Sequence, residues 1–123
     1  MTDAEWICGW DQVFDGPWER HAGPAQTTFF AQVALAGMPP PLIELIRQQQ
    51  LEILDWGCAL GDALPVLAQA FPASVLSGLD ISSRAVARAR ERYPDWTFES
   101  RPLRELGRQL PVVYTSNCLE HFP

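Results

Sequence analysis

The stretch LEILDWGCALGDALPVLAQAF, residues 51–71, decides the fold of this chain. A short apolar run ends at an acidic residue, passes through two glycines and resumes with the spacing of a helix. The pattern predicts a strand over 51–56 and a helix over 62–71, with Pro65 tolerated because it lies in the first helical turn. Between the two lies a glycine-bearing turn whose purpose the rest of the sequence explains.

Small residues occupy alternate positions of that turn, at Gly57, Ala59 and Gly61. Glycine lacks a Cβ, so the backbone there can bend sharply and a ligand can approach it closely. Asp55 at the strand end could instead fix the turn by accepting backbone N–H bonds. Ligands of an open parallel sheet bind beyond the carboxyl ends of its strands, so we expect the binding site at this turn.

The same alternation of short apolar runs and helix-like segments continues to the end of the chain. Further strands are predicted over 74–80, 95–100 and 111–116, and helices over 82–93, with Ser82 or Ser83 as cap, and over 102–110. Strands separated by helices indicate right-handed crossovers and a parallel sheet, hence an α/β fold.

Residues 1–50 precede this pattern and form an N-terminal aromatic arm followed by helices. Aromatic residues recur about every fourth position, at Trp6, Trp10, Phe14 and Trp18. Glycines and a proline interrupt the run, so we expect an irregular arm that either closes over the site as a lid or packs against the sheet. Helices are predicted over 27–37, capped by Thr27 or Thr28, and over 42–50.

Composition narrows the classes of function. The 123 residues, 47% of them hydrophobic, are enough for one domain. The net charge of -6 and the absence of lysine argue against a nucleic-acid partner, and no run is long enough to cross a membrane. Three cysteines without CxxC spacing suggest neither a disulfide framework nor a metal site and favour a reduced, cytoplasmic compartment.

The turn discriminates between two nucleotide cofactors. A dinucleotide fingerprint, G-x-G-x-x-G, would place glycines where Ala59 and Asp62 stand, which weakens the dehydrogenase interpretation. Asp55 followed by Gly57, Ala59 and Gly61 resembles the first motif, acid-x-Gly-x-Gly-x-Gly, of the Rossmann-like (class I) S-adenosylmethionine-dependent methyltransferases. The departure is Ala59 for the middle glycine. LSGLDIS, residues 76–82, and VVYTSNCLEHFP, residues 112–123, resemble the family's second- and fourth-strand segments.

The resemblance implies a role for each matching residue. Asp55, Gly57, Cys58, Ala59 and Gly61 would form the cofactor turn. The remaining roles fall to the later segments: Asp80 would accept both ribose hydroxyls, Ile81 would pack on the adenine, Ser116 would lie beside the methionine end, and Asn117, Glu120 and His121 would line the way to the acceptor. His121 is the candidate catalytic base, because histidine exchanges protons readily near neutral pH, although it could simply brace its loop.

The implied fold is a three-layer α/β/α domain with strand order 3-2-1-4 over residues 51–123, apparently truncated after the fourth strand, without the later strands of the full fold. The implied function is methyl transfer from S-adenosylmethionine, with S-adenosylhomocysteine as product, to an oxygen of a small-molecule or sugar acceptor. The alternative is a non-catalytic binding or assembly module. The fourth strand would leave an apolar edge. Either a further part of the chain covers this edge, or a second copy covers it by homodimerisation.

Overall fold

A four-stranded parallel sheet forms the centre of the molecule, whose computed structural model describes residues 1–122. The strands are β1 (Ile53–Trp56), β2 (Leu76–Asp80), β3 (Thr97–Ser100) and β4 (Val112–Tyr114). Their order is β3-β2-β1-β4, and every neighbouring pair is parallel. The predicted α/β class and strand order are confirmed. In the register, Asp55 of the central strand lies between Gly78 of β2 and Tyr114 of β4.

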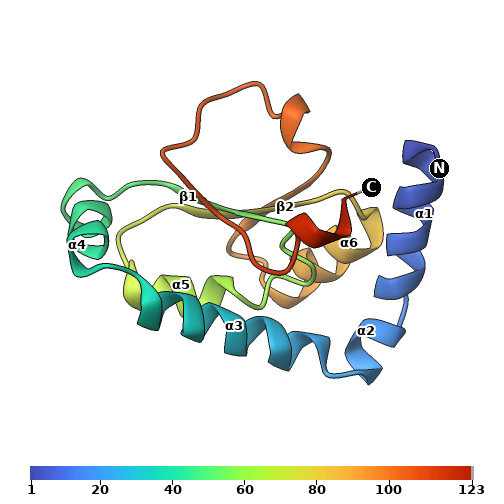
Figure 1. Ribbon diagram of the computed structural model, residues 1–123, viewed down its shortest axis with the longest axis horizontal. Helices are drawn as coiled ribbons and strands as arrows, with labels where there is room; N and C mark the ends of the chain where they lie inside the picture. Colours follow the sequence, from blue (N-terminus) through green and yellow to red (C-terminus); the bar gives the residue numbers. More distant parts are fainter. Residues whose placement is uncertain (123) are drawn as a thin grey trace.

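Four helices gather on one side of this sheet (Figure 1). They are α3 (Gly23–Gly37), α4 (Pro40–Gln49), α5 (Leu64–Ala70) and α6 (Ser83–Arg92). Their apolar sides meet the sheet in a core that includes Ile46, Leu67, Phe71, Val86 and Phe98. The core explains why short helices persist here, since most helical stability in proteins comes from tertiary packing.

The boundaries of these helices follow local chemistry. Ser82 caps α6 as predicted, its Oγ accepting a hydrogen bond from the backbone N–H of Ala85 at 3.1 Å. α3 begins at Gly23, four residues before the predicted cap, and the hydroxyl of Thr27 donates to the carbonyl of Gly23 instead. α4 begins at Pro40, because a proline is tolerated in the first helical turn.

The connection between β3 and β4 crosses the other side of the sheet (Figure 1). A helix was predicted over 102–110, but the structure has only a 3₁₀ turn, η1 (Leu103–Glu105). Gly107 follows it with φ +72°, a left-handed conformation that ends helical geometry. Arg108 then donates to Glu52 at 2.5 Å and ties the segment to the residue that precedes β1. The layer on this face is therefore thin.

The aromatic arm is helical, so the prediction of an irregular arm was wrong. It forms α1 (Asp3–Phe14) and α2 (Pro17–Arg20). A capping box begins α1: the Glu5 carboxylate accepts from the N–H of Thr2 at 2.7 Å, and the Thr2 hydroxyl accepts from the N–H of Glu5 at 3.2 Å. Pro17 occupies the first turn of α2, where it initiates a helix and does not break one.

No single helix within residues 1–122 is both long enough and apolar enough to cross a membrane. Together α3 and α4 pass that test of length and composition, with a bend of 103° between them.

Candidate functional site

A cavity of about 400 Å³ opens at the carboxyl ends of β1, β2 and β4. Five parts of the chain line it: the arm, the first half of α3, the end of β1 with the turn that follows it, the end of β2 and residues 114–122. Most of the residues predicted for the site are brought together there, namely Asp55, Gly57, Ala59, Asp80, Ile81, Ser116 and His121. Cys58 and Gly61 are not among its lining residues. Pro123, the last residue of the fourth-strand motif, lies outside the described residues.

Unusual backbone conformations form the turn after β1. The N–H groups of Gly57 and Cys58 both donate to the carbonyl of Leu79, at 2.8 and 3.1 Å, and so bind the turn to β2. Gly57 has φ +75°, and a Cβ there would lie 2.7 Å from the sulfur of Cys118. Ala59 has φ +49°, in the left-handed region that favours glycine. The position where the sequence departs from the motif therefore keeps the conformation that the motif's glycine would adopt.

Cys58 and Gly61 shape the turn from its inner side. The Cys58 side chain is 1% exposed in the core, and its thiol donates to the carbonyl of Ala59 at 3.6 Å. A Cβ at Gly61 would lie 3.0 Å from the ring of Phe98. The structure gives both residues a packing role, and their predicted contact with a cofactor stays a prediction.

Asp80 ends β2 and faces the cavity. Its Oδ2 accepts from the N–H of Ala59 at 2.9 Å and its Oδ1 from the N–H of Ser82 at 3.0 Å. Burial raises the pKa of this carboxyl to about 6, although the hydrogen bonds from Ser82 and Ala59 oppose that rise. A carboxylate oxygen can accept more than one hydrogen bond, so both oxygens can still receive a ligand hydroxyl.

The Asp55 carboxyl group, unlike that of Asp80, lacks hydrogen-bond partners within residues 1–122. Its side chain is 3% exposed, yet none of residues 1–122 hydrogen-bonds to its carboxyl group, so the proposed bracing of the turn by this side chain is not seen. Burial, and secondarily the charge of Asp80, raises the pKa of Asp55 to about 8. A buried polar group without a partner costs free energy, and such groups in a cavity are typical of a binding site.

Sequence reasoning missed two polar groups of the cavity wall. Tyr114 and Trp18 both line the cavity; the Tyr114 hydroxyl, close to Ser116, and the Trp18 indole N–H are themselves buried and make no well-formed hydrogen bond within residues 1–122. Burial also raises the pKa of Tyr114. Strand periodicity places Tyr114 near the site, but only the tertiary structure shows that its hydroxyl is buried.

Aromatic side chains close the outer side of the cavity. Trp6 and Trp56 each lie against Phe122, with ring centroids 4.9 and 5.4 Å apart, and Trp10 meets the edge of His121 at 4.9 Å. The His121 imidazole is about half exposed, with Nε2 3.7 Å from the Glu120 carboxylate. The arm lines the cavity, and through Phe14, which is 4% exposed, it packs on the turn after β1 and on α6 and not on the sheet.

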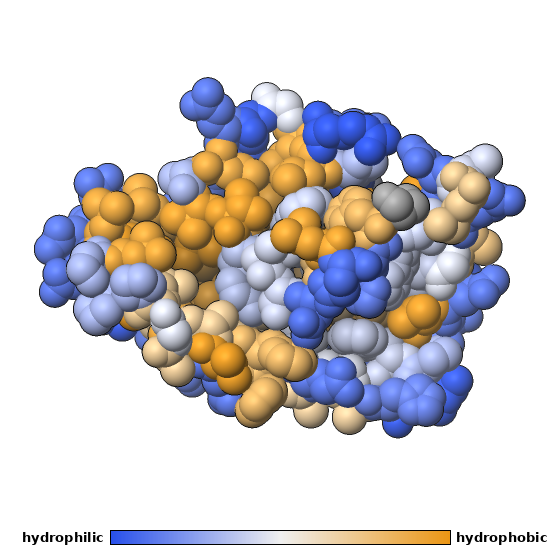
Figure 2. Space-filling model, viewed as in Figure 1, coloured by the Kyte–Doolittle hydropathy of each residue, from blue (hydrophilic) through white to orange (hydrophobic). Residues whose placement is uncertain are grey.

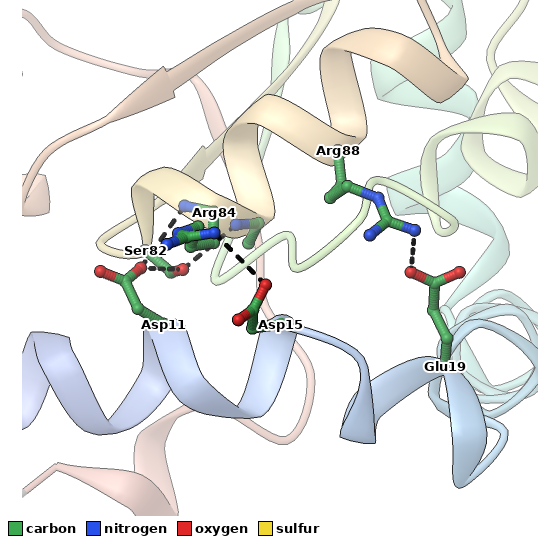
Figure 3. Close-up of polar contacts among 7 residues, drawn as sticks. Asp11, Asp15, Glu19, Ser82, Arg84 and Arg88 are labelled. Atoms are coloured by element: carbon green, nitrogen blue, oxygen red, sulfur yellow. Dashed lines mark hydrogen bonds and ion pairs between the residues drawn. The ribbon is translucent and has the colours of Figure 1, made fainter.

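Polar contacts bind the arm to α6 (Figure 3). Oδ1 of Asp11 accepts from the hydroxyl of Ser82 at 2.5 Å, Asp15 pairs with Arg84 at 3.3 Å, and Glu19 pairs with Arg88. Ser82 also donates its N–H to Asp80. One serine therefore joins the arm to the carboxylate at the end of β2.

Among residues 1–122, no group of three or more histidine, cysteine, aspartate or glutamate side chains is arranged to hold a metal ion.

Comparison with known proteins identifies the family to which the chain belongs. Residues 53–123 match the family described as Methyltransferase domain. The chain belongs to this family. Trans-aconitate 2-methyltransferase from Deinococcus radiodurans is 32% identical over 73 residues, covering 58% of this chain and 28% of that protein. The enzyme of the same name from Escherichia coli O1:K1 / APEC is 30% identical over 89 residues, covering 68% and 35%. The chain spans about a third of the length of these relatives.

Solved structures agree on the fold. Magnesium protoporphyrin IX methyltransferase from Synechocystis PCC 6803, solved with bound S-adenosylmethionine, is 25% identical, with a TM-score of 0.52 over 94% of this chain and 48% of that one. DesVI from Streptomyces venezuelae is 21% identical, with a TM-score of 0.51 over 94% of this chain and 44% of that one. The resemblance to class I methyltransferases is therefore confirmed.

Proposed function

We propose that this chain binds S-adenosylmethionine in the cavity and serves methyl transfer to a small-molecule acceptor, with a hydroxyl, such as that of a sugar, or an amine as the nucleophile. One observation carries the proposal: two buried carboxyl groups, Asp55 and Asp80, face the same cavity beside a turn whose small residues leave its backbone accessible to a ligand. The family and the fold supply the chemistry that such a site serves.

The residues present fit the cofactor. Asp80 offers an oxygen to each of two ribose hydroxyls, and Ile81 beside it offers an apolar surface to a base. Asp55 offers a carboxyl without a partner to the positively charged amino group at the methionine end. The carboxyl group of Asp55 lacks a hydrogen-bond partner within the described chain, and ligand binding would supply one.

When bound, S-adenosylmethionine supplies a methyl group made electrophilic by its positively charged sulfur. The protein's task is then to hold the acceptor in line and to exclude water. Trp6, Trp10 and Phe122 exclude water from the outer side. His121 lies at the same wall, where its imidazole can take the proton of the acceptor.

Calorimetric titration of the 123-residue chain with S-adenosylmethionine and S-adenosylhomocysteine tests the proposal, and we expect micromolar binding of both. Asp80→Ala should weaken binding by about 1.5–3 kcal/mol, the usual contribution of hydrogen bonds to a charged group. Asp95→Ala, which removes an exposed carboxyl away from the cavity, should leave the affinity unchanged. Circular dichroism must show that both variants are folded. Unchanged affinity in folded Asp80→Ala would refute the ribose assignment.

A second candidate function is a binding or assembly module without turnover. It would need the cavity and the turn after β1, but not a base at His121. Tight binding of the cofactor without transfer of labelled methyl groups to any small-molecule acceptor would support this function over the first.

The reduced, cytoplasmic compartment stays a prediction from cysteine usage, and Cys8, Cys58 and Cys118 are all unpaired in the described residues.

A further inference from the structure

In the part of the chain that the structure describes, the cavity is lined by carboxyl groups, without an arginine or a lysine to offset them. Three carboxyl groups line it, those of Asp55, Asp80 and Glu120. Within residues 1–122 no arginine lines it, and the chain has no lysine. Arginines stand nearby but are turned to other partners: Arg84 and Arg88 pair with the arm, and Arg92 pairs with Asp62. An acceptor that carries carboxylates would meet like charges without a compensating cation, which opposes binding.

The aromatic wall completes the chemistry of a cation site. Four tryptophans, Trp6, Trp10, Trp18 and Trp56, line the cavity, and tryptophan is the side chain whose ring face attracts a cation most strongly. Glu120 lies on the same side, its side chain 55% exposed and therefore free to turn toward a ligand. Aromatic faces with a carboxylate at their edge match an ammonium group.

An apolar acceptor would also suit an aromatic wall, so the wall alone does not decide. Glu120 decides, because an apolar ligand placed against it would take water from its carboxylate without supplying a partner. Asp80 and Asp55 are engaged by the cofactor in the proposed function, which leaves Glu120 for the acceptor.

We propose that the acceptor is a small amine, attracted in its protonated form by the tryptophan wall and Glu120, and that carboxylate acceptors are rejected. The proposal rests on the proposed function and narrows its acceptor from a hydroxyl or an amine to the amine. The bound ammonium gives one proton to His121, and the nitrogen lone pair forms a bond to the methyl carbon. The electron pair of the broken carbon–sulfur bond stays on sulfur, which leaves a neutral thioether and a methylammonium product.

Binding of two probes of the same shape tests the charge selection. The chain, saturated with S-adenosylhomocysteine, is titrated with choline and with 3,3-dimethylbutan-1-ol, in which carbon replaces the charged nitrogen. We expect choline to bind about 10-fold more tightly, and trans-aconitate, a tricarboxylate, not to bind. Glu120→Gln should reduce the preference for choline about 3-fold or more, whereas Glu105→Gln, an exposed acid in η1, should not change it.

The outcomes separate the two proposals, because binding of S-adenosylhomocysteine is measured in the same series. If S-adenosylhomocysteine binds but the neutral probe equals choline, the amine proposal is wrong and the proposed function stands. If neither cofactor form binds, the proposed function fails, and the amine proposal, which rests on it, fails with it. A transfer assay with labelled S-adenosylmethionine adds a direct comparison of glucosamine with glucose, and faster methylation of glucose would overturn the amine proposal.

Discussion

The carboxyl group of Asp55 makes the free protein less stable than it need be. The folded state holds this group at a pKa of about 8, raised from 3.8 by burial. Between these values the folded state keeps a proton that the unfolded state has lost. The contribution of Asp55 to stability is therefore highest below about pH 4, falls as the pH rises toward 8 and then levels off.

We predict that Asp55→Asn removes most of this pH dependence. At pH 8 the variant should be more stable than the parent by at least on the order of 1 kcal/mol, because one pKa unit corresponds to about that free energy. Thermal unfolding between pH 5 and 9 measures the difference. A weaker slope below pH 6 should remain, since burial also raises the pKa of Asp80 to about 6. Parallel profiles for parent and variant would contradict the prediction.

The backbone of Ala59 yields a second prediction. Its left-handed conformation, φ +49°, costs about 1 kcal/mol or more for a residue with a Cβ. Ala59→Gly relieves this strain but loses a buried methyl group worth about 0.8 kcal/mol. We expect its free energy of unfolding to stay within about 1 kcal/mol of the parent, and that of Ala59→Val to fall by about 2 kcal/mol or more. Urea denaturation measures both, and a fully stable valine variant would show the strain to be absent.

The sequence predicted which polar residues lie at the site better than it predicted which of their atoms have hydrogen-bond partners. Asp55, Asp80 and the turn were identified because strand ends and small residues follow local patterns. Tyr114 and Trp18 were missed as polar residues of the cavity wall, because whether a buried polar atom finds a partner depends on every neighbour around it. Local pattern carries no such information.

At the scale of elements, sequence misjudged helices where glycine and proline stand. Gly9 and Pro17 were taken as interruptions of the arm. A Cβ at Gly9 would meet no atom within 4 Å, so this glycine costs only its propensity, about 1 kcal/mol. Pro17 begins α2. At residues 102–110 the error was the opposite one, since a helix was predicted that does not form. Gly107 adopts a left-handed conformation that the apolar spacing of these residues does not reveal.

Docking of the arm on α6 depends on Asp11 more than on the visible ion pairs. Asp11 accepts from the hydroxyl of Ser82, which caps α6 and also contacts Asp80. We predict that Asp11→Ala loosens α1, raising the hydrogen-exchange rates of its amides about 5-fold or more, because a charge-assisted hydrogen bond contributes roughly 1–3 kcal/mol. It should also weaken cofactor binding through Ser82.

Asp15→Ala provides the matched control for Asp11→Ala. It removes a carboxylate one helical turn away whose pair with Arg84 is mostly exposed, and such pairs contribute little. We expect exchange rates in α1 to change less than 2-fold. If the two variants loosened α1 equally, general charge attraction would explain the docking, and the specific contact with Ser82 would not.

At the scale of the whole molecule, the sheet leaves one apolar edge. Strand order and an open edge at the fourth strand followed from the resemblance, but the exposed leucines of α4 could be seen only in three dimensions. β4 is an outer strand of the sheet, and Val113 on it is 42% exposed. Leu42 and Leu45 of α4 are exposed to a similar degree, and Figure 2 shows apolar surface over β4 and the adjoining part of α4. Unpaired strand edges of this kind readily pair with another chain.

We predict that the 123-residue chain, prepared alone, self-associates through β4. Light scattering across a concentration series should show a dimer that becomes a monomer in Val113→Lys, since a lysine on an edge strand opposes pairing. Val75→Lys is the matched control, because Val75 is 65% exposed but precedes β2 in the interior of the sheet, and it should leave the dimer intact. A parent chain that stays monomeric at every concentration would show that β4 does not recruit a second copy. Equal dissociation by both lysines would place the contact elsewhere, so only a loss confined to Val113→Lys assigns the interface to β4.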